Sequence, residues 1–219
     1  MIAGTLRIAI KDNIDVVGWP TRAGSKAISR EPASRDAVVV TRLREAGILI
    51  GSKTRMDEFA MTTSGPGMRN PADHSRSAGG SSGGSAIAVA VGGYCAALGT
   101  DTGGSSRVPA AYCGVVGFKP TFGGVPTDGV VPLSPSLDHV GILGCSVSAV
   151  REVFRVVGNA EDRSEVRPWG TSRRLGIPRD SYLAAASIEV RRAFARTVDR
   201  LRQQGWETVE VDLPSPQLV

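Results

Sequence analysis

The chain has 219 residues, a formal net charge of +5, and 41% hydrophobic and 21% charged residues. This balance is ordinary for a soluble globular protein, and the length suffices for one good hydrophobic core. The longest apolar run, around residues 86–91, falls far short of the ~20 residues that a membrane-spanning helix needs, so no membrane partner is expected. Much of the positive charge is arginine scattered over residues 151–202, a pattern that does not favour direct nucleic-acid binding.

The N-terminal stretch MIAGTLRIAI and the cysteines indicate the cellular compartment. The stretch lacks the basic start, apolar segment and small-residue cleavage site of a secretion signal, which predicts a cytoplasmic protein. Cys95, Cys113 and Cys145 are odd in number, lie among apolar residues and show no C-x-x-C spacing. This predicts reduced core side chains rather than a disulfide frame or a zinc site, so no metal is expected.

The N-terminal part predicts strand, helix and strand. Residues 6–10 form a short apolar segment, predicted as a strand that ends in Lys11. Residues 36–46 repeat apolar side chains at helical spacing, and Gly47 is a natural helix stop before a second predicted strand at 48–50.

The middle of the chain is rich in glycine and serine. Residues 62–85 predict a long irregular loop, of a kind that is usually functional in compact domains. It leads into a predicted helix of small residues at 85–91, followed by short strands around 94–98 and 114–118.

In the last part of the chain, from residue 174 onward, strand and helix patterns alternate more plainly. This part predicts a strand at 174–177, an amphipathic helix at about 188–204 and a strand at 207–211. One face of the helix carries Val190, Phe194, Val198 and Leu201. Strands that alternate with helices predict a layered α/β fold, in a single domain over residues 1–219.

Two stretches, AGGSSGGSA at 78–86 and GTDTGGSSR at 99–107, predict sharp turns. A serine that follows two glycines at a strand-to-helix turn can expose its hydroxyl while neighbouring N–H groups point the same way, as an oxyanion hole requires. One such loop alone is better explained as a plain turn with serine caps. Two in one chain favour catalysis.

A serine nucleophile needs a base, usually histidine, and the chain has only His74 and His139. The pattern around Ser82 matches a G-x-S-x-G nucleophile elbow, but no apolar strand precedes it. Moreover, the only later histidine directly follows Asp138, and no separate acid partner is evident. Lys11 remains as a candidate base, either a surface lysine or a desolvated amine whose lowered pKa lets it accept protons.

Three segments resemble the hallmark segments of the amidase signature family: IAIKDNIDVVGWPTRAGS, RSAGGSSGGSAIAVA and LGTDTGGSSRVPAAYCGVVGFKPT. The order of the lysine and the two serines matches, as does the spacing between the serines. The resemblance continues through SLDHVGILGCSV and more weakly into the tail, so it covers nearly the whole chain. It implies a mixed sheet layered between helices.

The resemblance also implies roles for single residues in the hydrolysis of a carboxylic amide, without a cofactor. Ser105 would be the nucleophile that accepts the acyl group. Ser81, on a non-proline cis peptide, would relay the proton to neutral Lys11, the base.

Further residues would support that chemistry. The expected donors to the oxyanion are the N–H groups of Thr102, Gly103, Gly104 and Ser105. Asp101 and Arg107 are expected to brace the nucleophile turn through a charge-assisted contact, with a plain surface pair as the alternative.

Members of the family are usually longer than this chain, with helices before the lysine strand and a large part after the tail. The resemblance therefore implies a partial domain that lacks the C-terminal part of the family fold, is incomplete at both ends and has low intrinsic activity. A homo-oligomer or a completing partner chain stays open.

The preferred function is a free-standing amidase of small-molecule amides, and the sequence suggests three alternatives. The motifs MDEFAM, RNP and DTGGS resemble the glutamine-hydrolysing subunit of the tRNA-dependent amidotransferase, which releases ammonia for a partner subunit. However, TTSGPGMRNP is shorter than in that subunit, and GGSSRVPAAYCG departs from its usual continuation, so the amidase is preferred. A non-catalytic scaffold derived from an amidase stays open. A phosphate-binding module at the glycine-rich loop is disfavoured because no G-x-x-x-x-G-K-[ST] pattern occurs.

Overall fold

The computed structural model describes residues 6–159, 173–179 and 183–213. The chain divides into two compact units, Met1–Ser164 and Glu165–Val219, and the boundary between them lies outside the described residues. The single domain over residues 1–219 stays a prediction. Within the described residues, no helix has the length and apolar character needed to cross a membrane.

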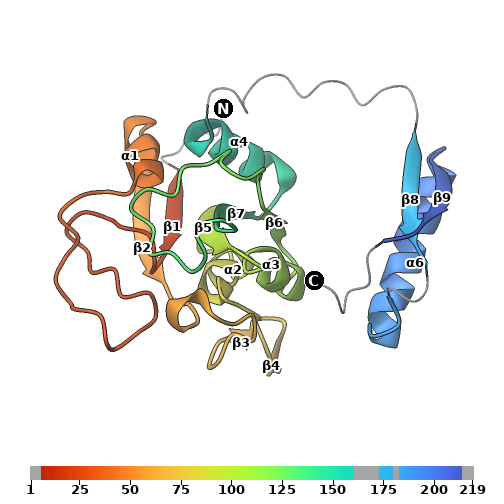
Figure 1. Ribbon diagram of the computed structural model, residues 1–219, viewed down its shortest axis with the longest axis horizontal. Coiled ribbons are helices and arrows are strands. Elements are labelled where there is room, and N and C mark those ends of the chain that lie inside the picture. The colour runs from red at the N-terminus through yellow and green to blue at the C-terminus, as the bar shows by residue number, and fades with distance from the viewer. Residues whose placement is uncertain (1–5, 160–172, 180–182, 214–219) are drawn as a thin grey trace. The chain divides into compact units, whose positions relative to one another are not determined.

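The first unit is built around a five-stranded mixed sheet of order β2-β1-β5-β7-β6 (Figure 1). The strands are β1 Arg7–Lys11, β2 Leu49–Thr54, β5 Ala96–Asp101, β6 Val116–Phe118 and β7 His139–Gly144. Strand β1 runs parallel to β2 and β5, whereas β7 runs antiparallel to β5 and β6. Because β1 and β5 are parallel, their last residues, Lys11 and Asp101, lie at the same edge of the sheet.

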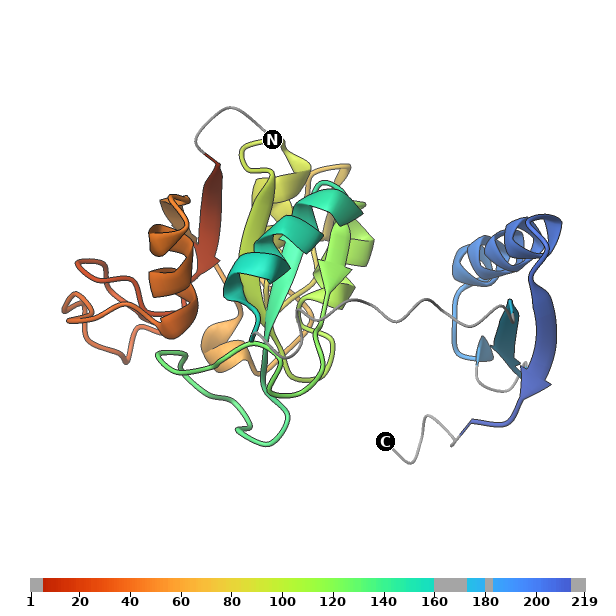
Figure 2. The same ribbon diagram turned by 90° about the horizontal axis from the view of Figure 1, so that it is seen from above.

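Helices cover both faces of this sheet (Figure 2). They are α1 Val38–Glu45, α2 Gly83–Ala90, α3 Arg107–Cys113 and α4 Val147–Val157. Helices α1 and α4 pack on one face and α2 and α3 on the other. The mixed α/β fold with helices layered on a sheet is as expected from the sequence.

The two faces differ in side-chain size because successive strand residues point to opposite sides. Ile8, Ile10 and Leu98 pack toward α1 and α4, in the larger core cluster. Ala9 and Ala97 pack toward α2 and α3, in a cluster of small side chains. The alanine face lets the backbone of α2 lie close to the sheet.

The remaining elements of this unit are short. A 3-10 turn, Glu58–Ala60, follows β2, and a small hairpin joins β3 Arg69–Asn70 to β4 Asp73–Ser77. The hairpin lies inside the stretch 62–85 that was expected to be irregular throughout, so that expectation is wrong in part.

The cysteines are free, but their expected place in the core is wrong for two of them. Cys95 and Cys145 are exposed, and Cys113 is half-buried. Cys95 precedes β5 and Cys145 follows β7 directly across the pair, where the Cys145 N–H donates to the Cys95 carbonyl at 2.9 Å. The strands leave the core at that point, so apolar neighbours in sequence do not bury the thiols.

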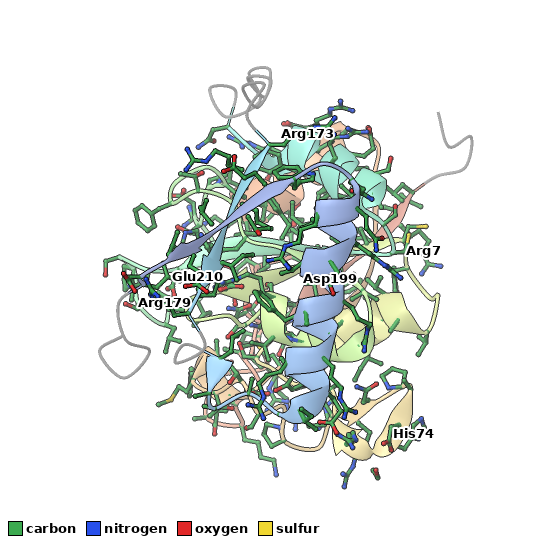
Figure 3. The ribbon with its side chains drawn as sticks, turned by 90° about the vertical axis from the view of Figure 1, so that its right-hand side faces the viewer. Arg7, His74, Arg173, Arg179, Asp199 and Glu210 are labelled. Carbon is green, nitrogen blue, oxygen red and sulfur yellow. The ribbon has the colours of Figure 1, made fainter. Side chains whose placement is uncertain are left out.

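The second unit contains the parallel strands β8 Arg174–Pro178 and β9 Glu207–Val211, joined by α6 Ile188–Gln203. These bounds agree closely with the sequence prediction. The Ser187 hydroxyl caps α6 by accepting from the N–H of Val190. Beside β9, Arg179 forms ion pairs with Glu210 at 3.0 Å and with Asp212 at 2.6 Å (Figure 3).

A substitution at Gly84 tests how closely α2 packs against the backbone that follows β2. The Gly84 N–H donates to the Arg55 carbonyl at 3.2 Å, and a Cβ at this position would lie 2.7 Å from the Arg55 backbone nitrogen. We expect Gly84→Ala to lower the free energy of unfolding by about 1–3 kcal/mol, because backbone has to move. Urea denaturation measures the change.

Gly93→Ala is the matched control, since a Cβ there would meet only ordinary contacts from 3.4 Å outward. Equal stabilities of the two variants would contradict the close packing of α2.

Candidate active site

Lys11 ends β1, and its side chain is completely buried. Its Nζ lies 2.7 Å from both Ser81 Oγ and Thr100 Oγ1, while no carboxylate of the described residues is within ion-pair distance. Desolvation therefore lowers the pKa of Lys11 from 10.5 to about 7, although the more distant charges of Asp57 and Asp101 oppose the shift. Lys11 is not a surface lysine, and its amine can be neutral near pH 7.

Ser81 is held in a turn that packs against Asp57. The Gly80–Ser81 peptide bond is cis, and Ser81 is fully buried. The Asp57 N–H donates to the Ser81 carbonyl at 3.3 Å, and a Cβ at Gly80 would lie 2.7 Å from Asp57 Cγ. The Asp57 carboxyl group therefore packs directly against the backbone of Gly80. A side chain at position 80 would collide with it, so this residue has to be glycine.

Ser105 lies in the turn between β5 and α3 and is 3% exposed. The backbone N–H of Ser82 donates to the Ser105 carbonyl at 3.0 Å, which ties the two serine turns directly together. Lys11, the Ser81 turn and the Ser105 turn thus meet at one edge of the sheet.

The structure argues against the nucleophile elbow at Ser82. The buried Ser82 Oγ donates to the Thr100 carbonyl at 3.0 Å and accepts from the Thr100 N–H at 3.2 Å. Both bonds link the start of α2 to β5. The Ser82 hydroxyl therefore serves as a structural cross-link.

Asp101 is fully buried beneath the Ser105 turn. Its carboxylate accepts from the N–H groups of Gly104 at 2.8 Å and Ser106 at 3.1 Å, and from Arg107 Nε at 3.0 Å and Nη2 at 2.9 Å. Burial acts to raise the pKa of Asp101, but the hydrogen bonds from Arg107 and Ser106 outweigh it and hold the pKa below its usual value. The pair is a bidentate contact inside the turn and not a plain surface pair.

The expected oxyanion donors are not all available. The Gly104 N–H is committed to Asp101, because a buried carboxylate needs donors, so the expectation for Gly104 does not fit this structure. The N–H groups of Thr102, Gly103 and Ser105 have no acceptor among the described residues. The Thr102 hydroxyl is fixed by donation to Asp138 Oδ1 at 2.5 Å.

Neither histidine forms a hydrogen bond with Ser81 or Ser105 among the described residues. His139 lies with Nδ1 3.1 Å from the Asp101 carbonyl and Nε2 3.2 Å from Lys119 Nζ. His74 is exposed on the β3–β4 hairpin (Figure 3). Within the described residues, no group of three or more His, Cys, Asp or Glu side chains could hold a metal ion.

The sequence analysis does not identify Thr100, Asn13 or Asp57 as residues of this site. Thr100 Oγ1 accepts from Lys11 and from Asn13 Nδ2 at 3.1 Å, so Thr100 orients the amine. Asp57 is buried against the Ser81 turn, and its Oδ2 accepts from the Gly65 N–H at 3.1 Å. Thr100 stands inside GTDTGGSSR and Asp57 inside MDEFAM, but only the folded chain brings them to Lys11.

Comparisons with known proteins identify the family of this chain. The model of the family described as Amidase matches residues 5–219. A Salinibacter ruber protein named as a glutamyl-tRNA(Gln) amidotransferase subunit is 41% identical, over 95% of this chain and 44% of that protein. A solved amidase is 44% identical with a TM-score of 0.85, over 95% of this chain and 48% of that one. The peptide amidase of Stenotrophomonas maltophilia is 31% identical with a TM-score of 0.82, over 97% and 49%.

The chain thus spans about half the length of the relatives that it matches. Since the family model covers almost the whole chain, the protein belongs to the amidase family, as its Lys-Ser-Ser motifs indicate.

Proposed function

We propose that this chain carries the acyl-transfer chemistry of an amidase that acts on a small-molecule carboxylic amide. The observation that carries the proposal is the contact of Lys11 with Ser81. An amine with a pKa of about 7 lies 2.7 Å from a hydroxyl oxygen, in a turn bonded to that of Ser105. A base whose pKa lies near the working pH is the most effective proton acceptor.

The proton path follows from the hydrogen bonds of the amine. A neutral lysine has two N–H donors and one lone pair. Lys11 Nζ donates to Thr100 Oγ1 and lies 2.7 Å from Ser81 Oγ. In the reacting state of the proposal, the lone pair of the neutral amine turns to the O–H of Ser81 and accepts its proton. Ser81 in turn takes the proton of Ser105, whose Oγ attacks the carbonyl carbon of the amide.

Breakdown of the tetrahedral intermediate completes the first half of the reaction. The carbon–nitrogen bond breaks, the leaving nitrogen receives the proton through Ser81, and the acyl group stays on Ser105 Oγ. Water then attacks this ester with the same relay as base, which releases the acid and restores Ser105.

The free N–H groups of Thr102, Gly103 and Ser105 are the proposed donors to the oxyanion. Each such donor contributes a factor of about 10² to 10³ in rate. Asp101 and Arg107 are positioning residues, because their contact fixes the turn that aims these donors.

A second candidate is glutamine hydrolysis for an amidotransferase. It is favoured by the 41% identity to a protein named as a subunit of such an enzyme. Ammonia release from free glutamine, compared with release from simple amides, separates the two candidates. A homo-oligomer or a completing partner chain, and a cytoplasmic location, are further proposals that fit either candidate.

A fluorophosphonate serine probe with peptide mapping tests the nucleophile and its relay. We expect labelling at Ser105 in the wild type, none in Ser105→Ala, and labelling reduced at least a hundredfold in Lys11→Ala, because Ser105 loses its base. Ser75→Ala, on the exposed hairpin, is the matched control and should label like the wild type.

Labelling at Ser82 would contradict the assignment and favour the nucleophile elbow. Wild type and Ser105→Ala that behave alike in labelling and in hydrolysis would favour the non-catalytic scaffold.

The pH dependence of amide hydrolysis tests the state of Lys11. The neutral amine is the active form, and its fraction falls tenfold per pH unit below the pKa of about 7. We therefore expect the rate constant to rise with pH up to about 7 and then level off, in an assay between pH 5 and 9. A rate that is still rising tenfold per unit at pH 9 would show that Lys11 keeps an ordinary pKa.

A further inference from the structure

A pocket lies at the carboxyl ends of β1 and β2, next to β2, the outermost strand of the sheet. Its cavity of about 340 Å³ is lined by Asp12, which follows β1, and by Lys53 and Arg55 around the end of β2. The loop after β1 adds Arg22 and Lys26. Because β1 and β2 are parallel, their carboxyl ends bring these cationic side chains to one place.

Only part of this positive charge is balanced within the fold. Lys53 lies 3.6 Å from Asp12 and donates to the Ile14 carbonyl at 2.6 Å, so it holds the loop in place. Arg22, Lys26 and Arg55 have no acidic partner among the described residues. The pocket therefore has three unpaired cationic groups.

Besides Asp12, the carboxylate of Glu58 adjoins the pocket through Ser25. Glu58 Oε1 accepts from the hydroxyl of Ser25, which lines the pocket, at 2.6 Å. This bond fixes Ser25, and within the described residues Glu58 forms no ion pair with the three cationic side chains.

Arg22 gives an independent indication of a ligand site. Its Nε is buried and has no hydrogen-bond partner among the described residues. A buried donor without an acceptor is costly, so a small turn of the side chain that let Nε donate to a bound oxyanion would be favourable.

The backbone next to Arg22 is fixed rather than free to swing away. The Ala23 N–H donates to the Asp12 carbonyl at 3.0 Å, and the Ala23 carbonyl accepts from the Phe59 N–H at 2.8 Å. Ala23 is also fully buried with a φ of +48°. The pocket thus presents a guanidinium from a rigid position.

We propose that this pocket, lined by Arg22, Lys26 and Arg55, binds the phosphate group of a small molecule. Guanidinium groups bind phosphate oxygens in a fork of two parallel hydrogen bonds, and two guanidiniums with an ammonium suit a dianion. The cavity is at the lower end of the ~300–1,000 Å³ typical of small-ligand sites, which leaves room for a small organic group beside the phosphate. The lining includes none of Lys11, Ser81 and Ser105, so a binding measurement does not require amide hydrolysis.

Isothermal titration calorimetry of the whole chain tests the site, with inorganic phosphate and glucose 6-phosphate as probes at constant ionic strength in chloride. We expect saturable binding at one site per chain. Arg22→Gln and Arg55→Gln should each weaken it at least tenfold, because each removes a charged fork. Arg151→Gln removes an exposed arginine on α4 outside the pocket and should leave the affinity unchanged.

The two probes distinguish the source of the phosphate. Tighter binding of the sugar phosphate assigns an organic phosphate, and equal binding assigns inorganic phosphate; both support the site. Circular dichroism verifies that each variant is folded.

Three results would overturn the proposal. They are the absence of saturable binding by the folded wild type, equal weakening in Arg151→Gln, and binding of a single-stranded RNA oligonucleotide that phosphate does not displace. The last would indicate an extended basic surface for nucleic acid instead of a pocket.

Discussion

The burial of one amine at the end of a strand is the constraint on which the candidate site depends. Lys11 has no contact with water and no ion-pair partner among the described residues, so the fold stabilises its neutral form. A lysine in that state accepts a proton near neutral pH, which an exposed lysine does not. The roles proposed for the two hydroxyl groups follow, because both oxygens lie 2.7 Å from the amine nitrogen.

The layered fold places that amine against the serine turns. Alanines on one face of β1 and β5 let α2 lie close, and the turn that leads into α2 carries Ser81. Gly80 lies against the Asp57 carboxyl group, and Gly84 against the backbone of Arg55. Gly80 and Gly84 are thus required because neighbouring groups pack directly against them. This close packing brings the Ser81 turn to the Ser105 turn.

The sequence predicts several elements whose apolar pattern is regular, but the prediction omits α4, whose buried Val150, Val153 and Val157 also recur at helical spacing. The helix α1 and all of β8, α6 and β9 were recognised within a few residues, since their buried side chains recur at helical or strand spacing. The strand β7 was missed because Gly141 and Gly144 interrupt its apolar pattern. Both are needed as glycine, since a Cβ would meet Ser106 Cβ at 2.7 Å in one case and Val150 Cγ2 at 2.7 Å in the other.

The candidate site was predictable as a set of residues but not as a set of contacts. Local sequence left open whether Lys11 is exposed or buried, because only pairing with β2 and β5 and cover by α2 decide it. It also assigned the Gly104 N–H to an oxyanion, although the buried carboxylate of Asp101 takes that donor. The partner of a backbone N–H depends on tertiary packing, which a motif does not contain.

The protonation of Lys11 is the most direct test of this account. The ¹³C chemical shift of its ε-carbon, assigned by its loss in Lys11→Ala, can be followed by NMR from pH 5 to 11. The account predicts a titration midpoint of about 7. A midpoint near 10.5, the ordinary value, would mean that the amine is charged at neutral pH and cannot act as the base.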